Sequence, residues 1–415
     1  MNEYGLAIDL GTTRISMSIV NIRNRECIRS LSFDNPQNPF GDDVISRIKH
    51  QVEDRSDFPI LTRIVRNAVA KKASALLDGS DISKQEITEV VLVGNTAMHH
   101  IFYNLPVDSL IKEPYVTRNK KATTGAAEDI GFKFTNAVYY SPPIFESFVG
   151  SDAMAVILGF GMSYDVYPSF AIDIGTNSEI ILQYYSSIWV TSAASGPAFE
   201  GMSLDCGVRA TDGAIDSVKI NRNYSPSFTT LGAKKPIGIC GAGAISALNA
   251  LRLARILSHE GSLNRQFQSD WLKENGGIVS YIIAGANETS TGQPVYLNQV
   301  DIRMLQQSKA SIRAAIEILL CEGNCGPSEI KNLYLTGAFG SGLDVSSSKN
   351  IDMFPHFQNA AISQRVGGAL SGAEILVWSE VARKEADNIA QHTKYVDLMN
   401  HPNYDQIHSE HLFFP

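Results

Sequence analysis

Two short turns in this sequence carry the same residue types in the same order. The first reads AIDLGTT over residues 7–13, and the second reads AIDIGTN over residues 171–177. In each turn, glycine lets the backbone bend tightly and approach a ligand closely. The amides and hydroxyls that follow form a concavity suited to an anion. Two such turns therefore predict a clamp that holds the β- and γ-phosphates of a nucleotide from both sides.

The side chains of the two turns suggest separate roles. An aspartate next to a phosphate suits Mg²⁺ or its water shell, so we expect Asp9 and Asp173 to position Mg²⁺ through bound water. The residues expected to hold phosphate oxygens are Gly11, Thr12, Thr13, Gly175, Thr176 and Asn177. One Asp-x-Gly-Thr turn alone is often only a hairpin, but two copies at equivalent places in two half-chains are much stronger evidence.

The elements around the turns repeat as well. Apolar or alternating runs predict strands over 4–10 and 14–21, and again over 169–174 and 178–185. Helical spacing of apolar residues follows in each half, over the ranges 60–77, 238–257, 301–322 and 368–386. Each half thus opens with two strands joined by a Gly-Thr turn and continues with helices and strands. This pattern predicts a duplicated α/β domain with a cleft between the copies.

Composition limits the class of protein. The chain has 415 residues, which is enough for two or three domains, and a formal net charge of −8, which argues against a nucleic-acid or anionic-membrane partner. No apolar run reaches the roughly 18 residues of a membrane span. The start, MNEYGLAID, lacks the basic region of a signal peptide, and the five cysteines are sparse. We therefore expect a cytoplasmic protein with reduced thiols.

Several motifs together resemble the superfamily of acetate kinase, sugar kinases, heat-shock chaperones and actin. AIDLGTT is similar to its first phosphate motif, AIDIGTNSEI to its second, and LYLTGAFGSG (333–342) to its adenosine motif, while VVLVGNTAMHH (90–100) resembles a connecting region. The resemblance implies two actin-like, ribonuclease-H-like lobes with a nucleotide cleft between them. A Rossmann dinucleotide fold fits poorly, because no early strand–Gly-loop–helix unit opens the chain.

A narrower resemblance extends over nearly the whole chain. Stretches such as NPQNPFGDDVISRI (35–48), SFVGSDAMAVIL (147–158) and SAASGPAFEGMSLDCGVRATDGAID (192–216) resemble the ATPase domain of the reductive activators of corrinoid proteins. The resemblance implies an enzyme that uses ATP to return a Co(II) corrinoid to Co(I). It implies ATP and Mg²⁺ as ligands and a corrinoid protein as partner, and we allow for a homodimer.

The sequence departs from that family in three places. No C-x₄-C-x₂-C spacing of a plant-type ferredoxin domain is present, so we expect no iron–sulfur cluster in this chain and a separate, ferredoxin-like electron donor. Ser178 stands where glycine is usual in the second phosphate turn. The adenosine motif reads GAFG where the family has GGFG. Nucleotide binding is still expected.

The resemblance also suggests further site residues. Asp152 stands where sugar kinases and exopolyphosphatases of the superfamily place an acidic base, so we expect it to orient the attacking water; the alternative is a helix N-cap. Glu200 is the second candidate, with a loop carboxylate at a domain interface as its alternative. Nucleotide contacts are expected from Gly241, Gly243, Gly337, Phe339 and Gly340, although Phe339 equally suits core packing.

Two other residue pairs have simpler interpretations. The spacing of Cys321 and Cys325 would let two subunits share a [4Fe–4S] cluster, but a lone C-x₃-C at a helix end usually consists of two ordinary thiols. His99 and His100 are expected in a helix, without a metal.

The predicted organisation is a first actin-like lobe over 1–165, a second over 166–385 and a C-terminal tail over 386–415 that packs back on the lobes. The leading function is ATP-dependent reductive activation of a corrinoid protein. A small-molecule kinase or other ATPase of the superfamily is the alternative, and an ATP-gated scaffold or chaperone ranks below both.

Overall fold

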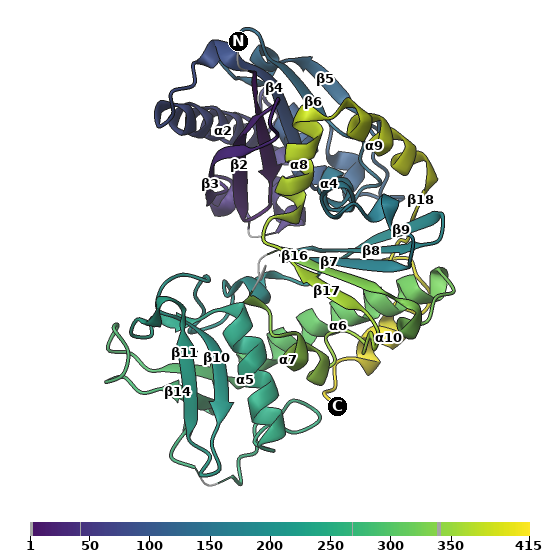
Figure 1. The fold of residues 1–415 in the computed structure, drawn as a ribbon. Coiled ribbons are helices and arrows are strands. Elements are labelled where there is room, and N and C mark those ends of the chain that lie inside the picture. Colours follow the sequence, from purple (N-terminus) through teal and green to yellow (C-terminus); the bar gives the residue numbers. More distant parts are fainter. Residues whose placement is uncertain (1–2, 42, 268, 338–341) are drawn as a thin grey trace. The chain divides into compact units, whose positions relative to one another are not determined.

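The computed structural model describes residues 3–41, 43–267, 269–337 and 342–415 (Figure 1). The chain forms two compact units that alternate along the sequence. Unit 1 comprises Met1–Ala171, Ile181–Thr191 and Gly367–Val396, and unit 2 comprises Ile172–Ile180, Ser192–Val366 and Asp397–Pro415. The lobes expected from the sequence divide the chain once, near residue 165, whereas these units exchange segments several times. The lobe boundaries therefore stay a prediction.

Unit 1 is built on a six-stranded sheet with the strand order β3-β2-β1-β4-β6-β5. The strands are β1 (Tyr4–Leu10), β2 (Arg14–Asn21), β3 (Cys27–Asp34), β4 (Ile87–Gly94), β5 (Thr123–Ala126) and β6 (Val138–Ser141). β1 pairs antiparallel with β2 and parallel with β4, so that Asp9 lies opposite Ser16 on one side and Val93 on the other. The first predicted turn thus leaves the carboxyl end of a central strand.

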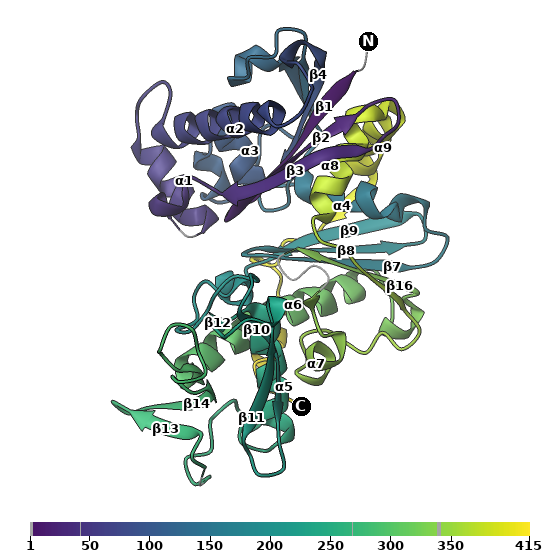
Figure 2. The same cartoon turned by 60° about the vertical axis from the view of Figure 1, so that its left-hand side comes forward.

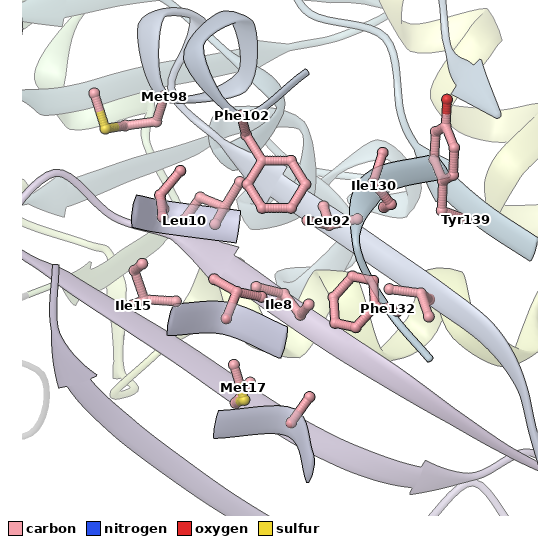
Figure 3. Close-up of a cluster of buried hydrophobic side chains, with 14 of the residues drawn as sticks. Ile8, Leu10, Ile15, Met17, Leu92, Met98, Phe102, Ile130, Phe132 and Tyr139 are labelled. Atoms are coloured by element: carbon pink, nitrogen blue, oxygen red, sulfur yellow. The ribbon is translucent and has the colours of Figure 1, made fainter. Parts of the chain in front are cut away.

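Helices pack on both faces of this sheet. α2 (Ile60–Asp78) and α3 (Thr96–Tyr103) share a buried apolar cluster with one face, as Figure 3 shows for Leu10, Met98 and Phe102. The other face contacts α4 (Ser151–Phe160) and α8 (Gly368–Trp378). Successive strand residues point to opposite faces, which explains why Ile8 belongs to the cluster while Gly5 lies against Val377 of α8.

The late helix α8 reaches its place in unit 1 through close glycine contacts. A Cβ at Gly372 would overlap the Ala155 carbonyl of α4, and one at Gly5 would overlap Val377. Figure 1 shows α8 beside α4 despite its distance in sequence, and α8 also contacts β1. The single helix expected over 368–386 is wrong in detail: α8 ends at Trp378 and α9 (Glu380–His392) begins after Ser379, whose side chain accepts from the Ala382 amide.

The second large sheet repeats the order of five strands of the first. It runs β17-β16-β7-β8-β9-β18 and comprises β7 (Ser169–Ile174), β8 (Ser178–Tyr184), β9 (Ser187–Ala193), β16 (Asn332–Gly337), β17 (Ala361–Gln364) and β18 (Thr393–Tyr395). β7 lies between β8 and β16, as β1 lies between β2 and β4. β9 and β17 then correspond to β3 and β6. The expectation of a duplicated α/β fold is thereby confirmed.

Unit 2 adds two small sheets and several helices (Figure 2). The sheets are β11-β10-β12 and β13-β14-β15, with β10 (Ala214–Ile220), β11 (Pro226–Thr230), β12 (Gly238–Ile239), β13 (Leu272–Asn275), β14 (Ile278–Ala284) and β15 (Val295–Asn298). The helices are α5 (Gly241–Leu253), α6 (Gln299–Glu322), α7 (Val345–Asn350) and α10 (Tyr404–Glu410); unit 1 also has α1 (Val44–Glu53). No helix among the described residues is long and apolar enough to cross a membrane.

The segment after α10 docks on α6 within unit 2. Buried Lys309 donates to the Phe413 carbonyl at 2.8 Å, and Gln306 donates to the Leu412 carbonyl at 2.7 Å. Phe414 is fully buried there. A charge-assisted hydrogen bond from Lys309 and a neutral one from Gln306 thus hold this segment in place.

Candidate phosphate-binding turns

The first turn, Gly11-Thr12-Thr13, joins β1 to β2 in unit 1. A Cβ at Gly11 would overlap the Arg14 carbonyl, so only glycine fits the bend. Asp9 is the second-last residue of β1, and it lies beside β2 and β4. The strand end therefore presents a carboxylate and a tight turn together, as the sequence predicts.

All three carbonyls of this turn are held by side chains from the next part of the chain. Asn35 donates to the Gly11 carbonyl at 3.0 Å, Arg47 to the Thr12 carbonyl at 2.6 Å, and Asn38 to the Thr13 carbonyl at 3.2 Å. In a trans peptide the carbonyl and the next amide point in opposite directions. The three side chains are called the brace of this turn. The amides after the braced carbonyls therefore point away from the brace, as an anion site requires.

Arg47 is the centre of that brace. It is fully buried on α1, and it also donates to the Gly41 carbonyl at 2.9 Å and to the Asn38 side chain at 2.8 Å. Its planar guanidinium offers several donors in a fixed geometry. One side chain thus joins the turn, the following loop and α1.

Asn95 supports the turn from a different element. It is the N-cap residue of α3, and its amide nitrogen donates to the Thr12 hydroxyl at 2.7 Å. Next to it, the Ser151 hydroxyl accepts from the Gly94 amide at 3.1 Å and so joins the end of β4 to α4. The connecting region between β4 and α3 therefore reaches the first turn within unit 1.

Asp152 is the second residue of α4, and Gly150 is the N-cap of that helix. Its carboxylate accepts from its neighbour's amide, that of Ala153, at 2.9 Å. Burial raises the pKa of Asp152 to about 6, although backbone hydrogen bonds act in the opposite direction. A half-buried carboxylate that titrates near neutral pH has the property of a general base.

The second turn, Gly175-Thr176-Asn177, joins β7 to β8 and has its own brace in unit 2. Ser195 donates to the Gly175 carbonyl at 3.0 Å, and the Gly196 amide donates to the Thr176 carbonyl at 2.8 Å. Ser178 shares a 2.7 Å hydrogen bond with Ser195. The residue that departs from the family pattern is therefore fully buried and supports the brace of its own turn.

Glu200 contacts the same turn. It ends the 3₁₀ helix η6 (Pro197–Glu200), and its carboxylate accepts from the Thr176 hydroxyl at 2.8 Å. The loop that carries Ser195 and Gly196 thus also delivers a carboxylate to Thr176. The second candidate base therefore lies at the predicted phosphate turn.

Gly337 ends β16 beside Asp173. Its φ of +95° lies in the left-handed region, and a Cβ there would overlap the Ile174 carbonyl and lie 2.5 Å from an Asp173 carboxylate oxygen. Glycine is therefore required at this strand end. Phe339 and Gly340, which follow it in the predicted adenosine motif, lie outside the described residues.

Gly241 and Gly243 lie in the first turn of α5, after the N-cap residue Cys240. A Cβ at Gly243 would overlap the Ile215 carbonyl of β10. Close packing of α5 on β10 therefore accounts for this glycine by itself, and its contact with a nucleotide stays a prediction.

The remaining candidates are ordinary buried or surface groups. Cys325 is buried, which raises the pKa of its thiol to about 11, whereas Cys321 is exposed at the end of α6. His99 and His100 lie in α3, and burial lowers the pKa of His99 to about 3. Within the described ranges, no group of three or more metal-binding side chains forms a cluster.

Sequence reasoning missed the residues that brace the turns. They are Asn35, Asn38, Arg47, Asn95 and Ser195. Each lies in a stretch that carries the family resemblance, but none bears a chemical role that its type alone reveals. The sequence did contain one signal for some of these residues. Polar side chains cluster in two short stretches, NPQNPFG (35–41) and the segment around Gly94-Asn95.

The duplicated sheets, each with a Gly-Thr turn after its first strand, define an actin-like protein of the ASKHA class. Residues 168–415 match the family model described as the C-terminal domain of RACo, the ASKHA domain, and residues 4–165 match the RACo middle region. The chain therefore belongs to the RACo family, the family of corrinoid reductive activators that its motifs resemble.

Three relatives show how far the likeness extends. The corrinoid activation enzyme RamQ of Eubacterium limosum is 27% identical over 99% of this chain and 70% of its own length. The [Co(II) methylated amine-specific corrinoid protein] reductase of Methanosarcina barkeri is 23% identical over 85% of this chain and 66% of its own. A solved reductive activator for corrinoid, iron-sulfur protein shares 28% identity with a TM-score of 0.90, over 100% of this chain and 66% of that one. The chain thus spans about two thirds of the length of these relatives.

Proposed function

We propose that this chain is the ATPase part of a reductive activator of a corrinoid protein. ATP binding and hydrolysis would drive reduction of the cobalt from Co(II) to Co(I), with electrons from a separate ferredoxin-like donor. The observation that carries the proposal is the pair of braced Gly-Thr turns in a chain of the RACo family. Named relatives that act on corrinoid proteins support the choice of partner.

The residues of both turns fit a nucleotide with its metal. Side chains hold the carbonyls of the first turn, and the amides that follow these carbonyls point to the opposite side, where phosphate oxygens would bind. Mg²⁺ usually keeps several waters and uses one or two carboxylates together with substrate phosphates. Asp9 and Asp173 would supply these carboxylates. When bound, Mg²⁺ would neutralise charge that develops on the phosphates.

The water that attacks the γ-phosphate would be oriented by Asp152. Its raised pKa, near 6, leaves most of the carboxylate ionised at neutral pH and able to accept a proton. Glu200 would act on the other turn: as the acceptor for the Thr176 hydroxyl, it fixes the direction of that side chain. Preorganised groups of this kind are the main catalytic resource in phosphoryl transfer.

The overall chemistry has two balanced parts. ATP and water give ADP, phosphate and a proton, and the donor loses one electron that converts Co(II) to Co(I). In this proposal the donor is a one-electron carrier outside the chain. The corrinoid partner is therefore the electron acceptor and the chain is the ATP-driven coupling element.

The test combines ATP turnover with cobalt spectroscopy. A Co(II) corrinoid protein, the chain, ATP with Mg²⁺ and a reduced one-electron donor are mixed, and Co(I) is followed by its absorption spectrum. We expect Co(I) to form only with ATP, and ATP hydrolysis to rise when the corrinoid protein is added. ADP in place of ATP is the control.

Two results would contradict the proposed function. If the chain neither hydrolyses ATP nor yields Co(I) with an artificial low-potential donor, the proposal is wrong. If ADP release instead depends on a small hydroxyl or carboxylate metabolite, the chain is a kinase of the same superfamily.

A further inference from the structure

The side-chain amide of Asn95 is fixed at both ends. Its oxygen accepts from the Met98 amide at 2.9 Å, as the N-cap of α3, and its nitrogen donates to the Thr12 hydroxyl at 2.7 Å. A backbone N–H is only a donor, so the oxygen of Asn95 must face α3 and the NH₂ group must face Thr12. The orientation of this amide therefore follows from the chemistry of its partners.

The orientation of the Asn95 amide also determines whether the Thr12 hydroxyl donates or accepts in this hydrogen bond. A hydroxyl has one proton and two acceptor lone pairs. Because the Asn95 NH₂ group is only a donor, Thr12 must use a lone pair for this bond. Its proton is consequently directed away from Asn95 and available to another acceptor. Asn95 and Thr12 are both buried, 7% and 8% exposed, where low dielectric strengthens such a bond.

The Thr176 hydroxyl in the second turn has the opposite hydrogen-bonding role. Its hydroxyl donates to the Glu200 carboxylate at 2.8 Å, and an ionised carboxylate is only an acceptor. The Thr176 hydroxyl thus donates its proton to Glu200, whereas the Thr12 hydroxyl accepts from Asn95 and its proton points elsewhere. The two threonines of one repeated motif therefore use their hydroxyls in different ways, one as an acceptor and the other as a donor.

We propose that Asn95 is a positioning residue that orients the Thr12 hydroxyl to donate a hydrogen bond to a phosphate oxygen of the nucleotide. The inference rests on the proposed function, because it takes the nucleotide as the ligand of turn 1. It assigns a role to the connecting segment between β4 and α3, which thereby acts on the phosphate site through a single amide. Thr12 touches the phosphate, and Asn95 acts through Thr12.

Two replacements separate this role from helix capping. Asp and Ser are as good N-caps as Asn, so Asn95→Asp and Asn95→Ser both keep the cap of α3. Asp accepts the Thr12 proton and turns the hydroxyl away from the phosphate. Ser is neutral and too short to reach Thr12. Any shared loss of ATP binding is therefore due to the missing amide donor and not to added charge or a lost cap.

The experiment measures binding of ATP and of adenosine, which lacks phosphates, by calorimetry. A hydrogen bond to a charged group contributes about 1.5–3 kcal/mol, so Asn95→Asp should weaken ATP binding about 10- to 100-fold and Asn95→Ser about 5-fold or more. Adenosine binding and the melting temperature should stay close to wild type. In a Thr12→Val background, Asn95→Ser should have no further effect on ATP affinity.

The outcomes are distinct. If wild-type protein binds ATP and both Asn95 variants bind it equally well, the inference is wrong and the proposed function stands. If adenosine affinity falls as much as ATP affinity, Asn95 has only a structural role and the inference is again wrong. If wild-type protein does not bind ATP, the proposed function fails together with the inference.

Discussion

The two Gly-Thr turns are nearly identical in sequence, yet they are supported by different chemistry. Side chains of Asn35, Asn38 and Arg47 brace the first turn. The second is braced by one hydroxyl, that of Ser195, and one backbone amide, that of Gly196. The motif therefore specifies the shape of the turn, whereas the surrounding segment decides how firmly it is held.

The braces also differ in how their donors are placed. Arg47 is buried and joins three groups, so its loss would leave several carbonyls without partners. Ser195 lies in the same loop as Glu200, and the support of turn 2 is thus close in sequence to its candidate catalytic carboxylate. The first turn is held by three side chains from a following segment, and the second is held by a loop that also carries the candidate carboxylate Glu200.

The largest effect is expected from the carboxylates that precede the turns. Asp173→Ala should lower ATP hydrolysis about 100-fold or more, because groups that stabilise charge in phosphoryl transfer are worth this much. Asp9→Ala is the matched variant in the other turn. Turnover is measured by phosphate release, and circular dichroism checks that each variant is folded. Unchanged turnover in Asp173→Ala would show that turn 2 is not a phosphate turn.

A comparable loss is expected at Asp152. Asp152→Asn removes the proton acceptor and should lower turnover about 100-fold, within the range of general-base catalysis. Wild-type turnover should fall tenfold per pH unit below about 6, where the raised pKa of Asp152 leaves the carboxylate protonated. The residual activity of the variant should lack this dependence. An unchanged acid limb in Asp152→Asn would assign the pKa to another group.

The raised pKa of Asp152 also predicts how the stability of the fold depends on pH. A carboxyl whose pKa is raised by folding contributes stability when it is protonated, and this contribution is lost as the pH rises through the folded pKa. At pH 7 the charged Asp152 therefore costs stability, and Asp152→Asn should melt at a higher temperature than wild type. At pH 4 the difference should be smaller. Equal melting temperatures at both pH values would contradict the raised pKa of Asp152.

The braces themselves can be compared directly by stability. Each buried group left unpaired costs about 1–3 kcal/mol. Arg47→Met leaves three such groups and should destabilise unit 1 by about 3–5 kcal/mol, whereas Ser195→Ala leaves the Gly175 carbonyl and the Ser178 hydroxyl and should cost about 2 kcal/mol. Urea unfolding measures both. Equal costs would show that the two braces have the same strength, and the contrast drawn between the turns would not hold.

The smallest effect concerns the residue that departs from the family. Ser178→Gly restores the usual residue but removes the hydrogen bond to Ser195 and adds backbone freedom to β8. We expect a loss of about 1–2 kcal/mol. Ser178→Ala is the control, since it removes only the hydroxyl. A Gly variant as stable as wild type would mean that Ser195 holds the turn without Ser178.

The sequence was sufficient to predict elements whose signals are local. The strands over 4–10 and 14–21 and the helix that begins at residue 60 were predicted to within a residue, because their apolar periodicity depends only on neighbouring residues. The single helix over 368–386 was wrong because Ser379 looks like any helix residue until its side chain caps α9. A cap is a geometric property that composition does not reveal.

By itself, the sequence determined the duplicated fold, the two Gly-Thr turns and the family. These depend on repetition and on residue types with few conformational options, such as Gly11. Only the tertiary structure decided which side chains hold the turns and which way the two threonine hydroxyls point. Arg47 and Asn95 are 35 and 83 residues from Thr12 in sequence, and folding alone brings them within hydrogen-bonding distance. A hydrogen bond depends on distance and direction in space, and neither is encoded in the spacing of residues along the chain.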